Sequence, residues 1–190
     1  RTMRYILLLV LFGVGNLYCQ DTTKQMWYHL DVFKEKKTLR CNHIEFFKDD
    51  SNKGEGLTIV TILYERDTGI TINRIVTEIK DDNIKGSLKG DGLIIVFEEG
   101  GKIELVNYWD DSKRGRSIFK LDKSHINELR NKTIKGIRYE SKMELPIDKN
   151  HLDIVKTIKK SNSGYFRDII RDMDRVNKGE LVIKVYEGGK

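Results

Sequence analysis

Short apolar runs separated by glycine-rich turns dominate the middle of the chain. Residues 93–97 contain no polar side chain and are bounded by glycines, which is typical of a strand buried on both faces. After an acidic, glycine-rich turn at 98–101, the chain returns with apolar side chains that change phase between Leu105 and Val106. The pattern therefore predicts a β-hairpin near the middle of a sheet, with a bulge in its second strand.

Alternation of Ile, Val and Thr with polar residues predicts further strands on both sides of this hairpin. They cover residues 39–47, 57–64, 70–79, 84–88, 117–121, 133–140, 143–147 and 181–186. In the first of these strands, Cys41 and His43 share the face opposite Ile44. Residues 21–37 fit either a strand or a helix.

Three segments have helical signals. Asp122 is a suitable N-cap for a short helix over residues 123–130. Residues 148–160 and 163–177 place apolar side chains three or four positions apart. The chain is therefore expected to have an α+β fold, with a mainly antiparallel β-sheet, a short helix between strands and two C-terminal helices packed on one face.

The first twenty residues have the layout of a secretory signal peptide. Arg4 supplies a positive start, residues 5–14 are apolar, and charged residues begin at Asp21. The apolar stretch is shorter than the roughly 20 residues that span a bilayer, although an uncleaved membrane anchor is the alternative. Residues 1–20 are thus expected to be a signal peptide and residues 21–190 a single α+β domain, secreted or periplasmic.

Cys19 stands where a bacterial lipoprotein signal would be cleaved and acylated. Such signals have a small residue just before the cysteine and usually a leucine three before it, whereas this chain has Tyr18 and Asn16. Membrane association is therefore expected only through an uncleaved signal or a lipidated Cys19. Cys41 is then the one other cysteine, and its simplest role is that of a small buried hydrophobic residue.

Composition describes a globular protein with a mild basic excess. The net charge is +6, and without Arg1 and Arg4 the 33 basic and 29 acidic residues leave +4, dispersed along the chain. Nucleic-acid binding requires basic residues clustered on one face, so we expect no nucleic-acid partner.

The chain lacks the motifs of common catalytic sites. None of its four histidines lies in a nucleophile elbow or a zinc-protease motif, and no phosphate-binding loop is present. We therefore expect no cofactor and no enzymatic activity. If a metal binds, the candidate ligands are His29, Cys41 and His43, although the paired spacing of structural zinc sites is missing.

One loop combines aromatic and basic side chains. Its members are Tyr108, Trp109, Lys113, Arg114 and Arg116. Aromatic rings beside cations suit an anion, a glycan or an acidic partner. This loop is the predicted binding patch for a protein, glycan or small-molecule partner.

Part of the sequence resembles small secreted or periplasmic proteins of Gram-negative bacteria that have no assigned function. The resemblance rests on the hairpin with its acidic turn, then the run from Phe119 to Asp122 opening a helix, then Ile137 to Tyr139. It implies a location in the cell envelope and an α+β fold.

A second resemblance is to lipocalin-like barrels, which carry small apolar ligands. It rests on Trp27 and Tyr28 near the start of the mature chain, many antiparallel strands, and a late helix before the last strand. Met26 replaces the glycine that usually precedes that tryptophan. The sequence thus predicts an exported, non-enzymatic binding or structural module, with a lipocalin-like carrier and an enzyme of unrecognised type as the alternatives.

Overall fold

The computed structural model describes residues 21–47, 56–80, 89–109, 115–144, 151–157 and 160–187. The predicted signal peptide at 1–20, including Cys19, and the predicted strand at 84–88 lie outside these ranges. Within them, no helix has the length and apolar character needed to cross a membrane.

The predicted central hairpin is confirmed. It consists of β6 (Gly92–Phe97) and β7 (Lys102–Val106). The other edge of β6 pairs with β9 (Ile134–Glu144), and β9 in turn pairs with β10 (His151–Thr157). All three pairings are antiparallel, in the order β10-β9-β6-β7. The predicted bulge is wrong, because the register between β6 and β7 runs without a shift and Val106 is 65% exposed.

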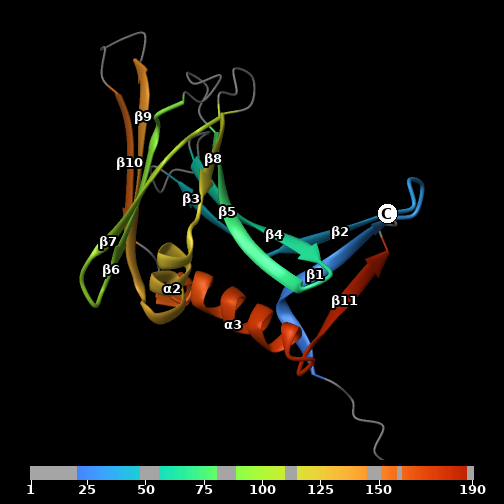
Figure 1. Ribbon diagram of the computed structural model, residues 1–190. Helices are drawn as coiled ribbons and strands as arrows, with labels where there is room; N and C mark the ends of the chain where they lie inside the picture. The colour runs from blue at the N-terminus through green and yellow to red at the C-terminus, as the bar shows by residue number, and fades with distance from the viewer. Residues whose placement is uncertain are drawn as a thin grey trace, which may run out of the picture.

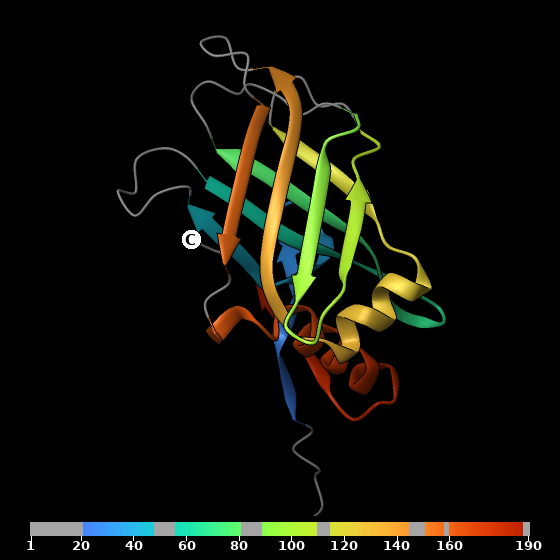
Figure 2. The ribbon, with the colours of Figure 1, turned by 90° about the vertical axis from the view of Figure 1, so that its left-hand side faces the viewer.

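The prediction that the 93–97 run is buried on both faces is also wrong. Leu93, Ile95 and Phe97 point into the core, whereas Val96 on the other face is 37% exposed. In Figure 2 the outer face of this sheet is turned to the viewer and neither α2 nor α3 covers it. The run is therefore a one-faced strand whose outer side chains happen to be aliphatic.

A second antiparallel sheet has the order β3-β4-β5-β8. Its members are β3 (His43–Phe47), β4 (Gly56–Arg66), β5 (Gly69–Lys80) and β8 (Arg116–Lys120). The β4–β5 hairpin turns at Asp67 and Thr68, as its sequence predicts. Alternate side chains of each strand point into the core and the others point outward.

A third, smaller sheet has the order β11-β1-β2. Strand β1 (Thr22–Asp31) pairs antiparallel with β2 (Lys36–Cys41) and parallel with β11 (Val182–Glu187). Only Asn42 separates β2 from β3. The backbone N–H of Asn42 donates to Gln25 O at 2.9 Å, and His43 begins the pairing of β3 with β4.

This junction changes which side chains face the core. Cys41 and Ile44 are both buried, whereas His43 is exposed. The prediction that Cys41 and His43 share a face is therefore wrong, because strict alternation stops where the chain passes from one sheet to the next.

The predicted short helix is confirmed as α2 (Lys123–Asn131), and the predicted last helix is confirmed as α3 (Tyr165–Asn177). Asp122 is the N-cap of α2 and accepts the His125 amide at 2.8 Å. A short 3₁₀ turn, η1 (Lys160–Asn162), precedes α3.

The prediction of a helix over residues 148–160 is wrong. Residues 151–157 form strand β10, so α3 is the single C-terminal α-helix in the described chain. The segment contains several β-branched residues, and β9 offers backbone partners along one side of it. The fold is α+β and mainly antiparallel, but it has several sheets rather than one.

The first two sheets face each other and the helices lie at one end of the space between them. Figure 1 shows α2 and α3 below the sheets, and Figure 2 shows the strands of one sheet crossing in front of the other. Fully buried side chains from both sheets and α2 fill the core: Ile59, Ile75, Leu93, Ile95, Phe97, Phe119, Leu129, Ile134 and Tyr139. A groove lined by β4, β5 and β8 lies outside this core.

Candidate functional site

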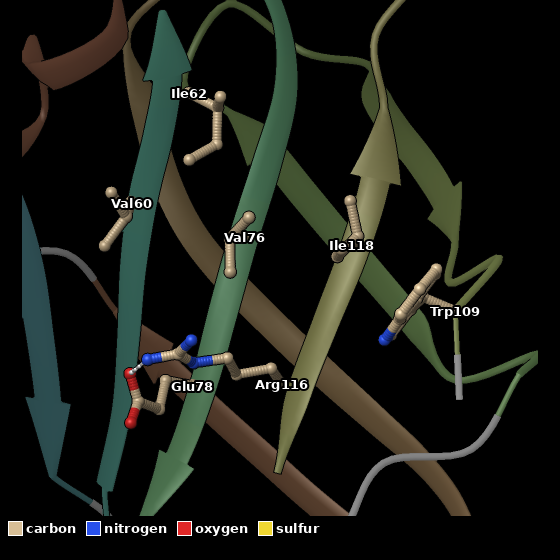
Figure 3. Close-up of a pocket in the computed structure, with 7 residues that line it drawn as sticks. All are labelled: Val60, Ile62, Val76, Glu78, Trp109, Arg116 and Ile118. Atoms are coloured by element: carbon tan, nitrogen blue, oxygen red, sulfur yellow. Dashed lines mark ion pairs between the residues drawn. The ribbon is translucent and has the colours of Figure 1, made fainter. Parts of the chain in front are cut away.

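A groove with a volume of about 500 Å³ lies on the outer face of the second sheet. Its lining side chains come from β4, β5, β8 and the segment after β7 (Figure 3). They are Val60, Ile62, Val76, Glu78, Trp109, Arg116 and Ile118. Four aliphatic side chains form the floor, a tryptophan stands at one side, and an ion pair lies at one end.

The strand register aligns the floor residues in a row across the sheet. Val60 pairs with Val76, and Val76 pairs with Ile118. All three are half-buried, whereas their chain neighbours Ile59 and Ile75 are fully buried on the inner face. The outer face of this part of the sheet thus carries an apolar row, which is unusual for the solvent-facing side of an antiparallel sheet.

Trp109 forms the side wall and is 53% exposed. Its backbone is fastened to Asn107: Asn107 Nδ2 donates to Trp109 O at 2.7 Å, and Trp109 N donates to Asn107 Oδ1 at 3.1 Å. The same Asn107 Oδ1 accepts the amide of Ile118 at 2.8 Å. A fully buried asparagine therefore joins the end of β7 to β8 and fixes the tryptophan beside the floor.

Cations lie on both sides of the apolar row. On one side, Arg116 Nη2 is 3.6 Å from Glu78 Oε2, and this pair is partly exposed. On the other side, the Lys120 ammonium is 4.7 Å from the centre of the Tyr108 ring. On the same side, the guanidinium carbon of Arg74 lies 5.6 Å from the centre of the Tyr64 ring. The arrangement offers an apolar surface between positive groups.

Two residues of the predicted aromatic and basic patch, Trp109 and Arg116, line this groove. Tyr108 is not among the lining residues, and its ring lies beside the Lys120 ammonium. Lys113 and Arg114 lie outside the described residues. The structure thus brings together side chains that are separated by a loop in the sequence.

Sequence reasoning missed the groove floor and Asn107. Val60, Val76 and Ile118 have the same chemical character as core residues, so their alternation predicts strands and nothing more. The available signal was that both phases of the 57–64 strand are apolar, which requires a cover on each face.

The candidate metal ligands do not converge. Cys41 Sγ donates to Thr61 O at 2.8 Å inside the core, whereas His43 Nε2 lies on the outer side, 3.4 Å from Glu45 Oε1. Burial raises the pKa of the Cys41 thiol to about 11, so it is protonated at neutral pH. Within the described ranges, no three His, Cys, Asp or Glu side chains are grouped to hold a metal.

A buried polar cluster joins the two facing sheets. Tyr139 Oη donates to Asp91 Oδ2 at 2.7 Å. Because its proton is used there, Tyr139 Oη accepts the hydroxyl proton of Ser117 Oγ, which is 2.8 Å away. The Lys142 amide donates to Asp91 Oδ1 at 2.6 Å. Burial raises the pKa of Tyr139, with the nearby Asp91 carboxylate adding to the effect. Asp91, Ser117 and Tyr139 are all fully buried, so this cluster acts as a structural tie between β8 and β9.

Comparisons with known proteins do not indicate a function. The chain matches no family model, no curated protein and no solved structure. The geometry of the groove and the sequence are therefore the evidence on function.

Proposed function

We propose that the chain is an exported, non-enzymatic binding module of the cell envelope that binds an amphipathic anion in the outer groove. The observation that carries this proposal is the apolar row Val60–Val76–Ile118 with cations on both sides. Such a surface suits a ligand with an apolar body and an acidic group. The signal-like layout of residues 1–20 supports the export part of the proposal.

The groove has enough apolar surface for modest affinity. A ligand that buries about 200 Å² of apolar surface gains about 5 kcal/mol at about 25 cal/mol/Å². Loss of translational and rotational freedom takes back a large part of this gain. The expected dissociation constant is therefore on the order of millimolar for a small probe.

The anion is expected to compete with Glu78 for Arg116. Both side chains are more than 40% exposed, so the ion pair is screened by solvent and contributes little stability. An acidic group on the ligand can therefore replace the Glu78 carboxylate as the partner of Arg116 at low energetic cost.

The chain's two tryptophans allow a direct test. Trp109 lines this groove, and Trp27→Phe leaves Trp109 as the only tryptophan. We expect 8-anilinonaphthalene-1-sulfonate to quench Trp109 emission by energy transfer with saturable binding. N-phenyl-1-naphthylamine, which has the same apolar body without the sulfonate, should bind at least fivefold more weakly.

Variants in the Trp27→Phe protein test the roles of floor and rim. Val76→Thr and Arg116→Gln should weaken binding of the sulfonate probe, whereas Glu78→Gln should strengthen it by removing the competing carboxylate. Val106→Thr, an exposed position on β7, is the matched control and should have no effect. Equal binding of the two probes, or no response to these three changes, would refute the proposal.

A further inference from the structure

A second groove, with a volume of about 380 Å³, lies where β1, the β2–β3 junction and the start of α3 meet. Its character differs from that of the outer groove. Polar and aromatic side chains line it, among them those of Gln25, Trp27, Asn42, Ser161, Asn162 and Asp168. Amide, hydroxyl, carboxyl and indole groups therefore share one concave surface.

Among the described residues that line the groove there is neither lysine nor arginine, and the lining histidine, His43, has its Nε2 3.4 Å from Glu45 Oε1. The whole chain has 35 such residues, so a groove without them is a local departure from the basic composition. Asp168 contributes a carboxylate, and its Oδ1 is 3.3 Å from Arg171 Nη2. The described lining thus offers an anion neither lysine nor arginine, and its one carboxylate is already paired, so a neutral polar ligand is the best match.

Trp27 provides a fixed aromatic surface. It is half-buried on β1, between β2 and β11, and the Tyr186 ring packs against it edge-on, with 6.5 Å between ring centres and an interplanar angle of 89°. An indole that is held in this way loses little conformational entropy when a flat ligand stacks on it. Sugar rings have an apolar face of C–H groups that stacks on such a surface.

The amide groups beside Trp27 are ordered. Asn42 Nδ2 donates to Gln25 Oε1 at 3.1 Å and to Lys24 O at 3.3 Å. In the described part of the chain, Gln25 Nε2 and Asn42 Oδ1 keep no protein partner, so one donor and one acceptor remain for a ligand. A hydroxyl group both donates and accepts, which is the complement of this pair.

We propose that this second groove binds a neutral saccharide, stacked on Trp27 and hydrogen-bonded by Gln25 and Asn42. Ser161, Asn162 and Asp168 line the same groove and offer further polar groups to sugar hydroxyls. The proposal is independent of the outer groove and concerns a ligand of another chemical class. Because each tryptophan lines one groove, the two proposals can fail separately.

The test uses the full chain with Trp109→Phe, so that Trp27 is the only tryptophan. Cellobiose, lactose and N,N′-diacetylchitobiose are the probes, and binding is followed by Trp27 emission. At least one disaccharide should give a saturable change with a dissociation constant on the order of 1 mM, which corresponds to about 4 kcal/mol. Glucuronate should bind more weakly than glucose, because a carboxylate, Asp168, lines the groove and neither lysine nor arginine is among its described lining residues.

Variants then locate the binding. Gln25→Ala should weaken binding of that disaccharide at least fivefold, and Asn162→Ala at least twofold. Asn127→Ala, on α2 and outside the groove lining, is the matched control and should leave the affinity unchanged. Thermal unfolding of each variant confirms that it is folded.

Three results would overturn the proposal. The first is no response of Trp27 to any of the three disaccharides up to about 50 mM. The second is unchanged affinity in folded Gln25→Ala, which would place the sugar elsewhere. The third is tighter binding of glucuronate than of glucose, which would mean that the groove selects anions.

Discussion

At the scale of single residues, Asp122 shows how one side chain defines an element. Its Oδ1 accepts the His125 amide at 2.8 Å, and the Asp122 amide donates to His125 Nδ1 at 3.4 Å. This is a capping box with histidine where glutamate or glutamine is usual. The His125 amide holds the pKa of the Asp122 carboxyl below its ordinary value, with the Ser124 hydroxyl adding to the effect.

The lowered pKa of Asp122 gives a pH dependence of known sign. The folded state binds a proton less readily than the unfolded state, so the contribution to stability is complete above the ordinary aspartate pKa of about 4. It is lost as the pH falls from there through the pKa of the folded state. Asp122→Asn keeps a capping side chain but removes the charge.

We therefore expect the melting-temperature difference between the wild-type chain and Asp122→Asn to shrink as the pH falls from 6 to 3. Thermal unfolding followed by circular dichroism measures it. Asp122→Ala should lie below both at pH 6, because it removes the cap itself. A difference between wild type and Asp122→Asn that grows toward acidic pH would contradict this assignment.

Some residues of the candidate site can be recognised in the sequence, and others cannot. Trp109 and Arg116 are recognisable in advance, because aromatic and basic side chains in one loop have few structural roles. Val60, Val76 and Ile118 are not, since an outward-facing valine in a strand has the same chemistry as an inward-facing one. Asn107 is also missed, because its role depends on which strand end lies beside β8.

At the scale of elements, Asn177 connects the last helix to the β4–β5 hairpin. Asn177 Oδ1 accepts the Ile70 amide at 2.7 Å, and Asn177 Nδ2 donates to Ile70 O at 2.8 Å. Gly69, at φ +107°, makes the approach possible, since a Cβ at that position would lie 2.5 Å from Asn177 Oδ1. The C-terminal end of α3 is thereby fixed on β5.

Replacing Asn177 by alanine should remove both hydrogen bonds. We expect a loss of about 1–3 kcal/mol in the free energy of unfolding, because two backbone groups of Ile70 lose partners in a partly buried place. Urea unfolding measures it. Lys178→Ala, at the neighbouring exposed position, is the control. Equal stability of both variants would show that the two hydrogen bonds between Asn177 and Ile70 contribute nothing.

The segment that forms β10 has an ambiguous sequence pattern. Residues 148–160 have apolar side chains at helical spacing, yet the part from 151 to 157 pairs with β9. Short apolar runs satisfy both periods, and the choice depends on whether a neighbouring strand offers backbone partners. Asp122 and the longer stripe of α3 avoid this ambiguity, which is why both of those helices are predicted correctly.

At the scale of the whole molecule, the tie formed by Asp91, Ser117 and Tyr139 holds the two facing sheets together. Tyr139→Phe leaves the buried Asp91 carboxylate without one donor and Ser117 Oγ without its acceptor. We expect a loss of about 1–3 kcal/mol, or about 2–10 °C in melting temperature for a chain of this size. Calorimetry measures it.

The control for Tyr139→Phe is Tyr186→Phe, because the Tyr186 side chain is largely exposed at the edge strand β11. It should leave the melting temperature within about one degree of the wild-type value. If the two variants melted together, the buried cluster would contribute no net stability.

The whole-molecule arrangement separates core from binding surface. Large apolar side chains occupy the inner faces of the two sheets, and the described grooves lie outside. The alternation along a strand predicts one inner face, but not which outer face carries a groove, because that depends on the register between β4, β5 and β8.

The proposed function requires that an amphipathic anion binds on the outer face of the second sheet. Methyl NMR of isoleucine- and valine-labelled protein, titrated with 8-anilinonaphthalene-1-sulfonate, tests it most directly. We expect saturable shifts at Val60, Val76 and Ile118, with Ile59 and Ile75 unmoved. Shifts confined to the inner methyl groups would place the ligand between the sheets, as in a lipocalin-like carrier, and would contradict the account.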